Sequence, residues 1–397
     1  SEKLAELFAQ QLVLSADGSG AASLGDAIRI AKQDYLATTL VLSPYDEKIL
    51  QSFTYYGLPM YSVGGPELDQ SFGGTRVAQP SEESIVESPV TFGPTIVGEG
   101  TAPDRTPVTI DVPVGPESGP GNLHLVETLE GNYWEVGGNT VTAQYRPVQP
   151  LIDASIPSTV DPTAGLLITG LTSQDVEPFT PRYLRPTVDL DDNERRVEPA
   201  DGSFPATLQR VTTGGSGDQR LLVAAGQYEE NVNQLNAVGT IVSDPDPGVG
   251  RQRLFTSVRG ELYPAGPTSD GVGPSFSRIA GNIGEDDGVI FFDVETSSDA
   301  QRVVVVYREG DSEQWLPLDL FRSAAAGNTW VGGFVPNTLE PVEFFVQAVA
   351  VDGDVGISSN KVENFFTTAP IEGGNLGIEV TPVIEPGSET AFVEGYY

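Results

Sequence analysis

The sequence has no cysteine and only one histidine. Without cysteine, the chain can form no disulfide, no thiolate metal site and no thiol nucleophile. The single histidine, His124, excludes zinc motifs that need two histidines. Because it lies in the alternating stretch NLHLVETL, we expect a half-buried or exposed strand residue rather than a catalytic base. A phosphate-binding loop of the G-x-x-x-x-G-K-S/T type and a G-x-S-x-G elbow are also missing, so we predict no catalysis by this chain alone.

Positive charge and long apolar runs are scarce as well. The chain has 21 lysines and arginines against 56 aspartates and glutamates, which gives a net charge of −35. Such a surface repels nucleic acid and anionic lipid, and no run approaches the roughly 18 apolar residues of a membrane span. Strong acidity suits a cation-rich medium that screens self-repulsion. We therefore expect an extracellular or cell-surface protein without nucleic-acid partners.

Helical periodicity is confined to the first 65 residues. The stretch EKLAELFAQQL places four apolar side chains on one face, at spacings of three and four: Leu4, Leu7, Phe8 and Leu12. In SLGDAIRIAKQDYL, Ser23 and Asp26 form a capping signal. The predicted buried face of this second helix consists of Leu24, Ile28, Ala31 and Tyr35. Nothing apolar nearby covers these faces, so we expect a sheet from upstream sequence or from another chain to do so.

The same region resembles the closing section of the gingipain-like cysteine peptidases. That family ends its caspase-like α/β domain with a helix of the G-D/E-A-x-x-x-A-K-x-x-Y type, followed by a segment like F-x-x-Y-G-x-P-M. The matching positions are Gly25, Asp26, Ala27, Ala31, Lys32, Tyr35, Phe53, Tyr56, Gly57, Pro59 and Met60. Leu58 departs from the acidic residue that is usual in the family. The family's catalytic His and Cys lie earlier in its domain, and no position here takes either role, so the resemblance implies a C-terminal piece without an active site.

After residue 65, short alternating runs separated by glycine and proline replace the helical pattern. The run VTIDVPV places Val108, Ile110, Val112 and Val114 on one face of a predicted strand. The run NYWEVGGNTVTAQYRPVQP predicts a hairpin that turns at Gly137, Gly138 and Asn139. Strands spaced by about 10 residues favour antiparallel sandwiches, so we expect one or two of them over residues 66–272.

The clearest unit covers residues 273–369. Val303, Val305 and Tyr307 alternate with Val304 and Val306, which predicts a strand that is covered on both faces. Two tryptophans, at positions 315 and 330, are natural core anchors. The pattern is similar to the Ig-like modules that close many secreted bacterial proteins.

The predicted fold is therefore mainly β. Tandem antiparallel Ig-like sandwiches follow a short helical remnant of a caspase-like α/β domain. The expected parts are a remnant at 1–65, one or two sandwiches at 66–272, an Ig-like sandwich at 273–369, and a linker with a tail strand at 370–397.

Two acidic clusters are candidate calcium sites, because hard cations bind several oxygen ligands at close range. The first lies in DLDDNE and comprises Asp189, Asp191, Asp192 and Glu194. The second comprises Asp352 and Asp354, in a DGD turn of the last unit. Neither has EF-hand spacing, and a solvated turn remains the alternative for each.

The tail at 370–397 contains LGIEVTPVI, which predicts a strand between glycine and proline linkers. Such a strand either pairs across subunits or docks on its own chain. We expect a protein partner or a second copy to bind through residues 1–65 and through this tail.

Three functions agree with the sequence. The first, which we favour, is a non-catalytic structural or assembly protein of the cell surface, such as a surface layer or filament. The second is the C-terminal fragment of a secreted cysteine peptidase whose His and Cys lie upstream or on another chain. The third is an adhesin or carbohydrate-binding module, which an exposed aromatic row would favour.

Overall fold

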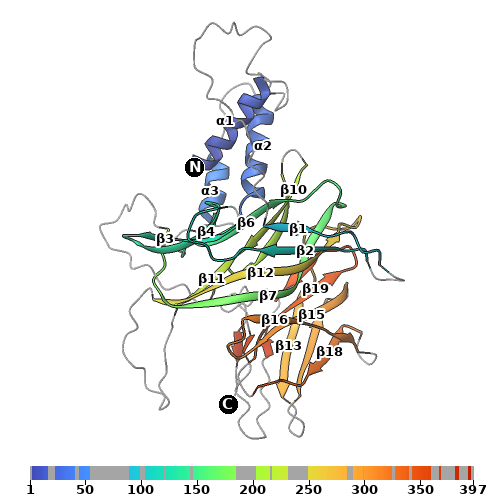
Figure 1. Cartoon of the computed structure of the whole chain (residues 1–397). Coiled ribbons are helices and arrows are strands. Elements are labelled where there is room, and N and C mark those ends of the chain that lie inside the picture. Colours follow the sequence, from blue (N-terminus) through green and yellow to red (C-terminus); the bar gives the residue numbers. More distant parts are fainter. Residues whose placement is uncertain are drawn as a thin grey trace, which may run out of the picture.

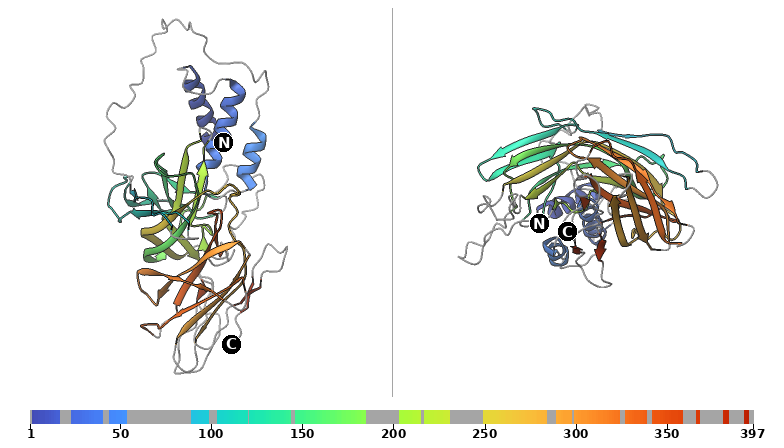
Figure 2. Two further views of the ribbon diagram at one scale, coloured as in Figure 1. Left: turned by 90° about the vertical axis from the view of Figure 1, so that its right-hand side faces the viewer. Right: turned by 90° about the horizontal axis from the view of Figure 1, so that it is seen from below.

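The computed structural model describes most of the chain between residues 2 and 394. The described ranges are 2–16, 23–40, 44–53, 89–98, 103–119, 121–143, 146–184, 203–214, 217–230, 249–283, 289–297, 299–323, 327–338, 342–358, 366–367, 381–383 and 392–394. Within them the protein is mainly β, with three helices and several antiparallel sheets. Figure 1 shows the helices at one end of the molecule, and Figure 2 shows the sheets from two further sides.

The helical layer consists of α1 (Glu2–Ala16), α2 (Leu24–Ala37) and α3 (Pro44–Ser52). The predicted cap of α2 is confirmed, because Ser23 Oγ accepts a hydrogen bond of 3.1 Å from the Asp26 amide. The three helices bury their apolar faces against one another in a cluster of Leu4, Leu7, Phe8, Ala31, Tyr35, Ile49, Leu50 and Phe53. The expectation that these faces lack a cover is therefore wrong, because α3 closes the third side of the cluster.

The helices stand on a four-stranded sheet that we call the upper sheet. Its strands, in spatial order, are β5 (Thr140–Val141), β6 (Gln149–Ser155), β10 (Gln219–Ala224) and β9 (Gln209–Thr213). Leu40, just after α2, enters a small core on one face of this sheet, beside Leu151 and Leu222. Ile152 and Val223 point to the opposite face and into the largest core.

An eleven-stranded sheet covers that opposite face. Its main path is β1 (Val90–Phe92), β2 (Thr106–Asp111), β12 (Gly250–Pro264), β7 (Thr163–Phe179), β16 (Gln314–Asp319), β15 (Ala300–Glu309), β19 (Val342–Ala350) and β20 (Val355–Ile357). Off this path lie β8 (Ser203–Phe204), β11 (Gly226–Glu230) and β21 (Phe366–Thr367). Gln314 and Trp315 of β16 pair with Thr172 and Leu171 of β7. The sheet therefore joins strands from both sides of the boundary that we expected between residues 272 and 273.

A lower sheet closes the other end of the molecule. It comprises β13 (Phe276–Ile283), β14 (Ile290–Thr296), β18 (Thr329–Phe334) and β17 (Phe321–Arg322), in that spatial order. Two hairpins complete the described strands: β3 (Leu123–Thr128) with β4 (Gly131–Val136), and β22 (Thr381–Val383) with β23 (Phe392–Glu394). The tail strand β22 lies beside β13.

Strand β15 divides two cores, as its sequence predicts. Val304 and Val306 belong to the largest core, together with Trp315 of β16. Val303 and Val305 point the other way, into the core beneath the lower sheet. The alternation that predicted burial on both faces is confirmed, since all four valines are fully buried.

Two shorter predictions in the middle region have different outcomes. The turn is confirmed, because Val136 bridges Asn139 and both intervening glycines have positive φ, 58° at Gly137 and 81° at Gly138. The hairpin expected around it is wrong, because β4 pairs with β3 and β5 pairs with β6. The apolar face of the run VTIDVPV is correct only as far as Val112. Val114 lies beyond the end of β2 and is 46% exposed, because the chain leaves the sheet there.

Candidate functional site

The predicted calcium ligands lie in two places. Asp189, Asp191, Asp192 and Glu194 fall outside the described residues. Asp352 and Asp354 lie in the turn between β19 and β20, where Gly353 has a φ of 90°. A side chain at Gly353 would place its Cβ 2.2 Å from the Pro264 carbonyl, so this turn packs directly against the end of β12.

The Asp354 carboxylate is occupied by hydrogen-bond donors. It is 1% exposed and accepts from the Ser269 hydroxyl at 2.8 Å and from the Asp270 and Gly271 amides at 3.0 and 3.2 Å. These donors use most of the acceptor sites that a cation would need, and they hold residues 269–271 against the turn. Within the described ranges no three His, Asp or Glu side chains converge as metal ligands, and calcium binding stays a prediction.

The histidine and the tryptophans that the sequence analysis singled out lie within strands. His124 is half-buried in β3, directly opposite Glu135. The three tryptophans, Trp134, Trp315 and Trp330, are 7%, 2% and 5% exposed, so each is a core residue as predicted. No helix among the described residues has the length and hydrophobicity needed to cross a membrane.

Among the described residues, a dense cluster of charged side chains lies where β7 and β12 meet β15 and β19. Arg253 contacts both Asp175 and Glu343, at 2.9 and 3.0 Å. Arg308 contacts the same two carboxylates, at 3.1 and 2.7 Å. The guanidinium side chains are only 5% and 6% exposed. Two buried arginines and two partly exposed carboxylates, Asp175 at 26% and Glu343 at 16%, thus form a ring of four contacts, which we call the arginine square.

Trp315 lies against both arginines of the square. Its ring centroid is 5.4 Å from the Arg253 guanidinium and 5.2 Å from that of Arg308. The indole Nε1 donates to the Ser173 hydroxyl at 2.9 Å, which fixes the ring. Cation–π attraction at buried sites adds about 2 kcal/mol or more, so the ring stabilises the charges that it covers.

The square keeps its carboxylates ionised. Burial raises the pKa of Asp175, but the hydrogen bond from Arg253 and the nearby guanidinium charges outweigh it and hold the pKa below its ordinary value. The pKa of Glu343 is lowered in the same way, with burial opposed by the charges of Arg253 and Arg308. Arg251 borders the square, at 3.7 Å from Asp175 and 3.6 Å from Glu343, and pairs with Glu229.

A second charged cluster links the same strands further along. Arg302 of β15 contacts Glu261 at 2.5 Å and Asp319 at 2.6 Å, and donates to the Tyr263 hydroxyl at 2.7 Å. Arg105 reaches Glu261 from the β2 side at 3.2 Å. Burial raises the pKa of Tyr263 to about 12, although the charge of Arg302 opposes this, so the phenol stays protonated at neutral pH.

Between the two charged clusters, the uncharged side chain of Gln347 joins β19 to β7. This residue of β19 is fully buried, and its Nε2 donates to the Ile168 carbonyl at 2.7 Å. Its Oε1 accepts from the Ile168 amide at 3.0 Å. Both backbone groups of a β7 residue are therefore satisfied by one side chain, which fixes β19 against β7. Together with Gln347, these mutually paired charges join β7 and β12 to β15 and β19, and we call this junction the fastening.

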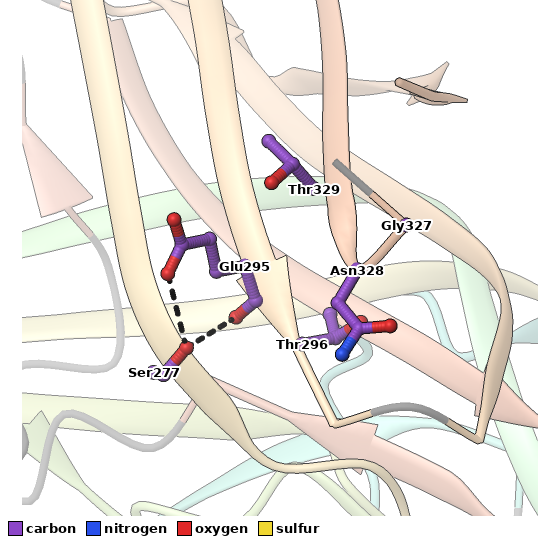
Figure 3. A pocket seen from close by; sticks show the side chains of 6 residues that line it. All are labelled: Ser277, Glu295, Thr296, Gly327, Asn328 and Thr329. Carbon is purple, nitrogen blue, oxygen red and sulfur yellow. Dashed lines mark hydrogen bonds between the residues drawn. The ribbon is translucent and has the colours of Figure 1, made fainter. Parts of the chain in front are cut away.

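A polar hollow of about 350 Å³ lies on the outer surface of the lower sheet (Figure 3). It is lined by Ser277, Glu295, Thr296, Gly327, Asn328 and Thr329. The Ser277 hydroxyl donates to the Glu295 backbone carbonyl at 3.4 Å and to its carboxylate at 3.5 Å. The Thr296 hydroxyl accepts a hydrogen bond of 3.1 Å from the indole of Trp330, which belongs to the core beneath the lower sheet.

Sequence reasoning did not find the square, Gln347 or the hollow. Arg253 and Asp175 are 78 residues apart, and Gln347 and Ile168 are 179 apart, so no local spacing announces them. A comparison with protein-family models, a search of curated proteins and a search of solved structures each gave no match.

Proposed function

We propose that this chain is a non-catalytic structural protein of the cell surface or extracellular space, built from Ig-like sandwiches and derived from a gingipain-like precursor. The observation that carries the proposal is the fastening of β7 and β12 to β15 and β19 by the arginine square and Gln347. Ordinary contacts between domains are less buried and permit relative motion. A chain whose role is to space or to bear load benefits from a junction that does not bend.

The strand order of the last unit supports its Ig-like assignment. In Ig domains of the constant type, strands A, B, E and D form one sheet and C, F and G the other. With β13 as strand A, β14 as B, β18 as E and β17 as D, the lower sheet follows the first order. The neighbouring β15, β19 and β20 follow the second order as C, F and G.

The acidic composition supports the proposed location. The net charge of −35 repels neighbouring copies unless cations screen it. Several arginines lie in the junction, where their charge is neutralised by buried partners, so they contribute little to screening the surface. We therefore expect assembly to depend on cations. Calcium should promote assembly more than other cations if the acidic cluster around Asp189 binds it.

Sedimentation velocity and electron microscopy of the native polypeptide test this proposal. We expect ordered oligomers or polymers that grow with protein concentration and with added CaCl₂, beyond the effect of NaCl at equal ionic strength. The helical layer and the tail at 370–397 are the proposed contacts, so deletion of residues 370–397 should weaken assembly. A chain that stays monomeric at every concentration in both salts contradicts the proposal.

The peptidase alternative rests on the resemblance of the segments around Gly25 and Tyr56 to the gingipain-like family. Intact mass and N-terminal sequencing of the native polypeptide separate the two. A mature chain that carries an upstream domain with a His and Cys pair would make this region the tail of a peptidase. A mature chain without one leaves the structural role in place.

A further inference from the structure

The outer face of the lower sheet carries polar and apolar groups side by side. Glu295 of β14 pairs with Thr329 of β18, and two residues further along the same face Asp293 pairs with Val331. Phe321 of β17 lies opposite Val331. Beyond the hollow, three apolar side chains lie on the same face beside the ion pair of Asp293 with Arg278, and we call them the apolar strip: Phe321, Val331 and Phe291.

The strip is accessible to solvent. Phe321, Phe291 and Val331 are 75%, 47% and 41% exposed, which is unusual for large apolar side chains on one sheet face. Phe291 lies against Gly333, where an added Cβ would stand 2.9 Å from its ring carbon Cδ1. The Phe291 ring therefore covers the backbone at Gly333, while much of it stays exposed to solvent.

The hollow offers hydrogen-bonding groups that the protein uses little. The Asn328 side chain is exposed at the rim, and the Glu295 carboxylate receives one long contact, of 3.5 Å, from Ser277. Gly327 leaves the rim open, because a Cβ built there meets no atom within 4 Å. A ligand that enters from solvent finds a carboxylate, an amide and hydroxyls within one cavity.

We propose that this surface binds an uncharged saccharide chain. A pyranose ring has an apolar C–H face, which packs on the exposed ring of Phe321, and hydroxyl edges, which bond to Glu295, Asn328 and Thr329. A purely apolar ligand would leave the polar groups of the hollow unpaired. An anionic glycan meets a protein of net charge −35 and a carboxylate in the hollow itself, so it is repelled. Saccharide binding goes beyond the structural role and does not depend on it.

The test uses calorimetric titration of the full chain with cellotetraose, maltotetraose and mannotetraose, and with trigalacturonate as the anionic comparison. We expect at least one neutral tetramer to bind with a dissociation constant of about 1 mM or below, and trigalacturonate not to bind. Failure of all three neutral tetramers at about 10 mM overturns the proposal, whatever the outcome of the assembly experiments. Binding of trigalacturonate in preference to them overturns it as well.

Variants locate the site. Gly327→Leu fills the hollow from a position with open space, and should weaken binding at least tenfold. Its matched control is Gly121→Leu, since Gly121 also has no atom within 4 Å of a built Cβ and lies outside the lower sheet.

Phe321→Ala removes the proposed platform and should weaken binding to a similar extent. Its control is Val351→Ala, because Val351 is 74% exposed and lies outside the strip.

Glu295→Gln keeps the shape of the side chain and removes its charge. It should admit trigalacturonate more readily than the wild type does, while a neutral tetramer loses less affinity than in Gly327→Leu. Unchanged binding in both Gly327→Leu and Phe321→Ala, with the fold intact by circular dichroism, places the saccharide elsewhere and overturns the site.

Discussion

Two junctions hold this molecule together, and they differ in their chemistry. Where β7 and β12 meet β15 and β19, buried ion pairs and Gln347 join strands that are far apart in sequence. Where the helical layer meets the upper sheet, the contacts among the described residues include one apolar side chain, Leu40, and two donors from β9 to carbonyls near the end of α2. Those donors are Thr212 Oγ1 to the Ala37 carbonyl at 2.7 Å and Arg210 to that of Thr39 at 3.2 Å.

This difference in chemistry predicts that the two junctions open with different ease. The carbonyls that end a helix lack partners within it, and water satisfies them as well as β9 does if the helices move away. The arginine square is harder to replace by water, because the Arg253 and Arg308 side chains are only 5% and 6% exposed and would stay largely buried without their carboxylate partners. We therefore expect the helical layer to open more readily than the junction of β7 and β12 with β15 and β19.

The largest expected effect comes from breaking the arginine square. Arg253→Met removes one corner and leaves Asp175 and Glu343 with fewer partners, which should lower the free energy of unfolding by about 3–5 kcal/mol. Urea denaturation followed by tryptophan fluorescence measures this. Arg259→Met, at an exposed position on the same strand, is the control and should change stability by about 0.5 kcal/mol or less. Equal effects of the two variants would refute the fastening role.

Removing Gln347 isolates the uncharged link. Gln347→Leu has similar volume but leaves the amide and carbonyl of Ile168 unpaired, which should cost about 2–4 kcal/mol. Gln314→Leu, at an exposed site of β16, serves as the control in the same denaturation experiment. A cost at Gln347 no larger than at Gln314 would show that β7 and β19 relax around the lost bonds.

Acid should weaken the charged junction selectively. Asp175 and Glu343 have lowered pKa values in the folded protein, so their contribution is complete above the ordinary carboxyl pKa of about 4 and is lost as pH falls through the lowered values. At neutral pH, Asp175→Asn should cost about 1.5–3 kcal/mol. The difference between wild type and this variant should shrink as pH falls towards 2.

Urea midpoints at a series of pH values provide the measurement. Asp311→Asn, in the exposed turn after β15, is the control and should run parallel to the wild type. A difference between wild type and Asp175→Asn that stays constant down to pH 2 would show that the carboxylate's charge is not what stabilises the square.

The smallest effect is expected at the helical layer. Thr212→Val removes the hydroxyl that donates to the Ala37 carbonyl and keeps the shape, so the loss should be about 1 kcal/mol. Limited proteolysis should cut within residues 2–53 about fivefold faster, with the rate elsewhere unchanged. Thr213→Val, at the exposed neighbouring position, controls for the substitution. Faster cleavage throughout the chain would mean that the two ends open together.

Much of the local structure follows from the sequence. Side-chain alternation predicted that β15 is buried on both faces, and the spacing from Ser23 to Asp26 predicted the cap of α2. The paired glycines at 137 and 138 predicted the turn after β4. In each case the interacting groups lie within a few residues, where the geometry of one strand, helix or turn determines the contact.

The junctions could not be predicted, because they depend on which distant strands meet. Nothing near Arg253 or Arg308 indicates that both will reach Asp175. The acidic pair at Asp352 and Asp354 shows the opposite difficulty, since its spacing suggested a cation while the Asp354 carboxylate holds residues 269–271. Local spacing does not reveal whether oxygen lone pairs are already used.

Hydrogen–deuterium exchange of the intact chain at neutral pH tests the contrast between the two junctions most directly. The account predicts that peptides from β7, β12, β15 and β19 exchange slowly and together, because one fastening holds them. Peptides from α1, α2 and α3 should exchange well before them. The account is contradicted if β15 and β19 exchange at a different rate from β7 and β12. It is also contradicted if the three helices exchange as slowly as those four strands.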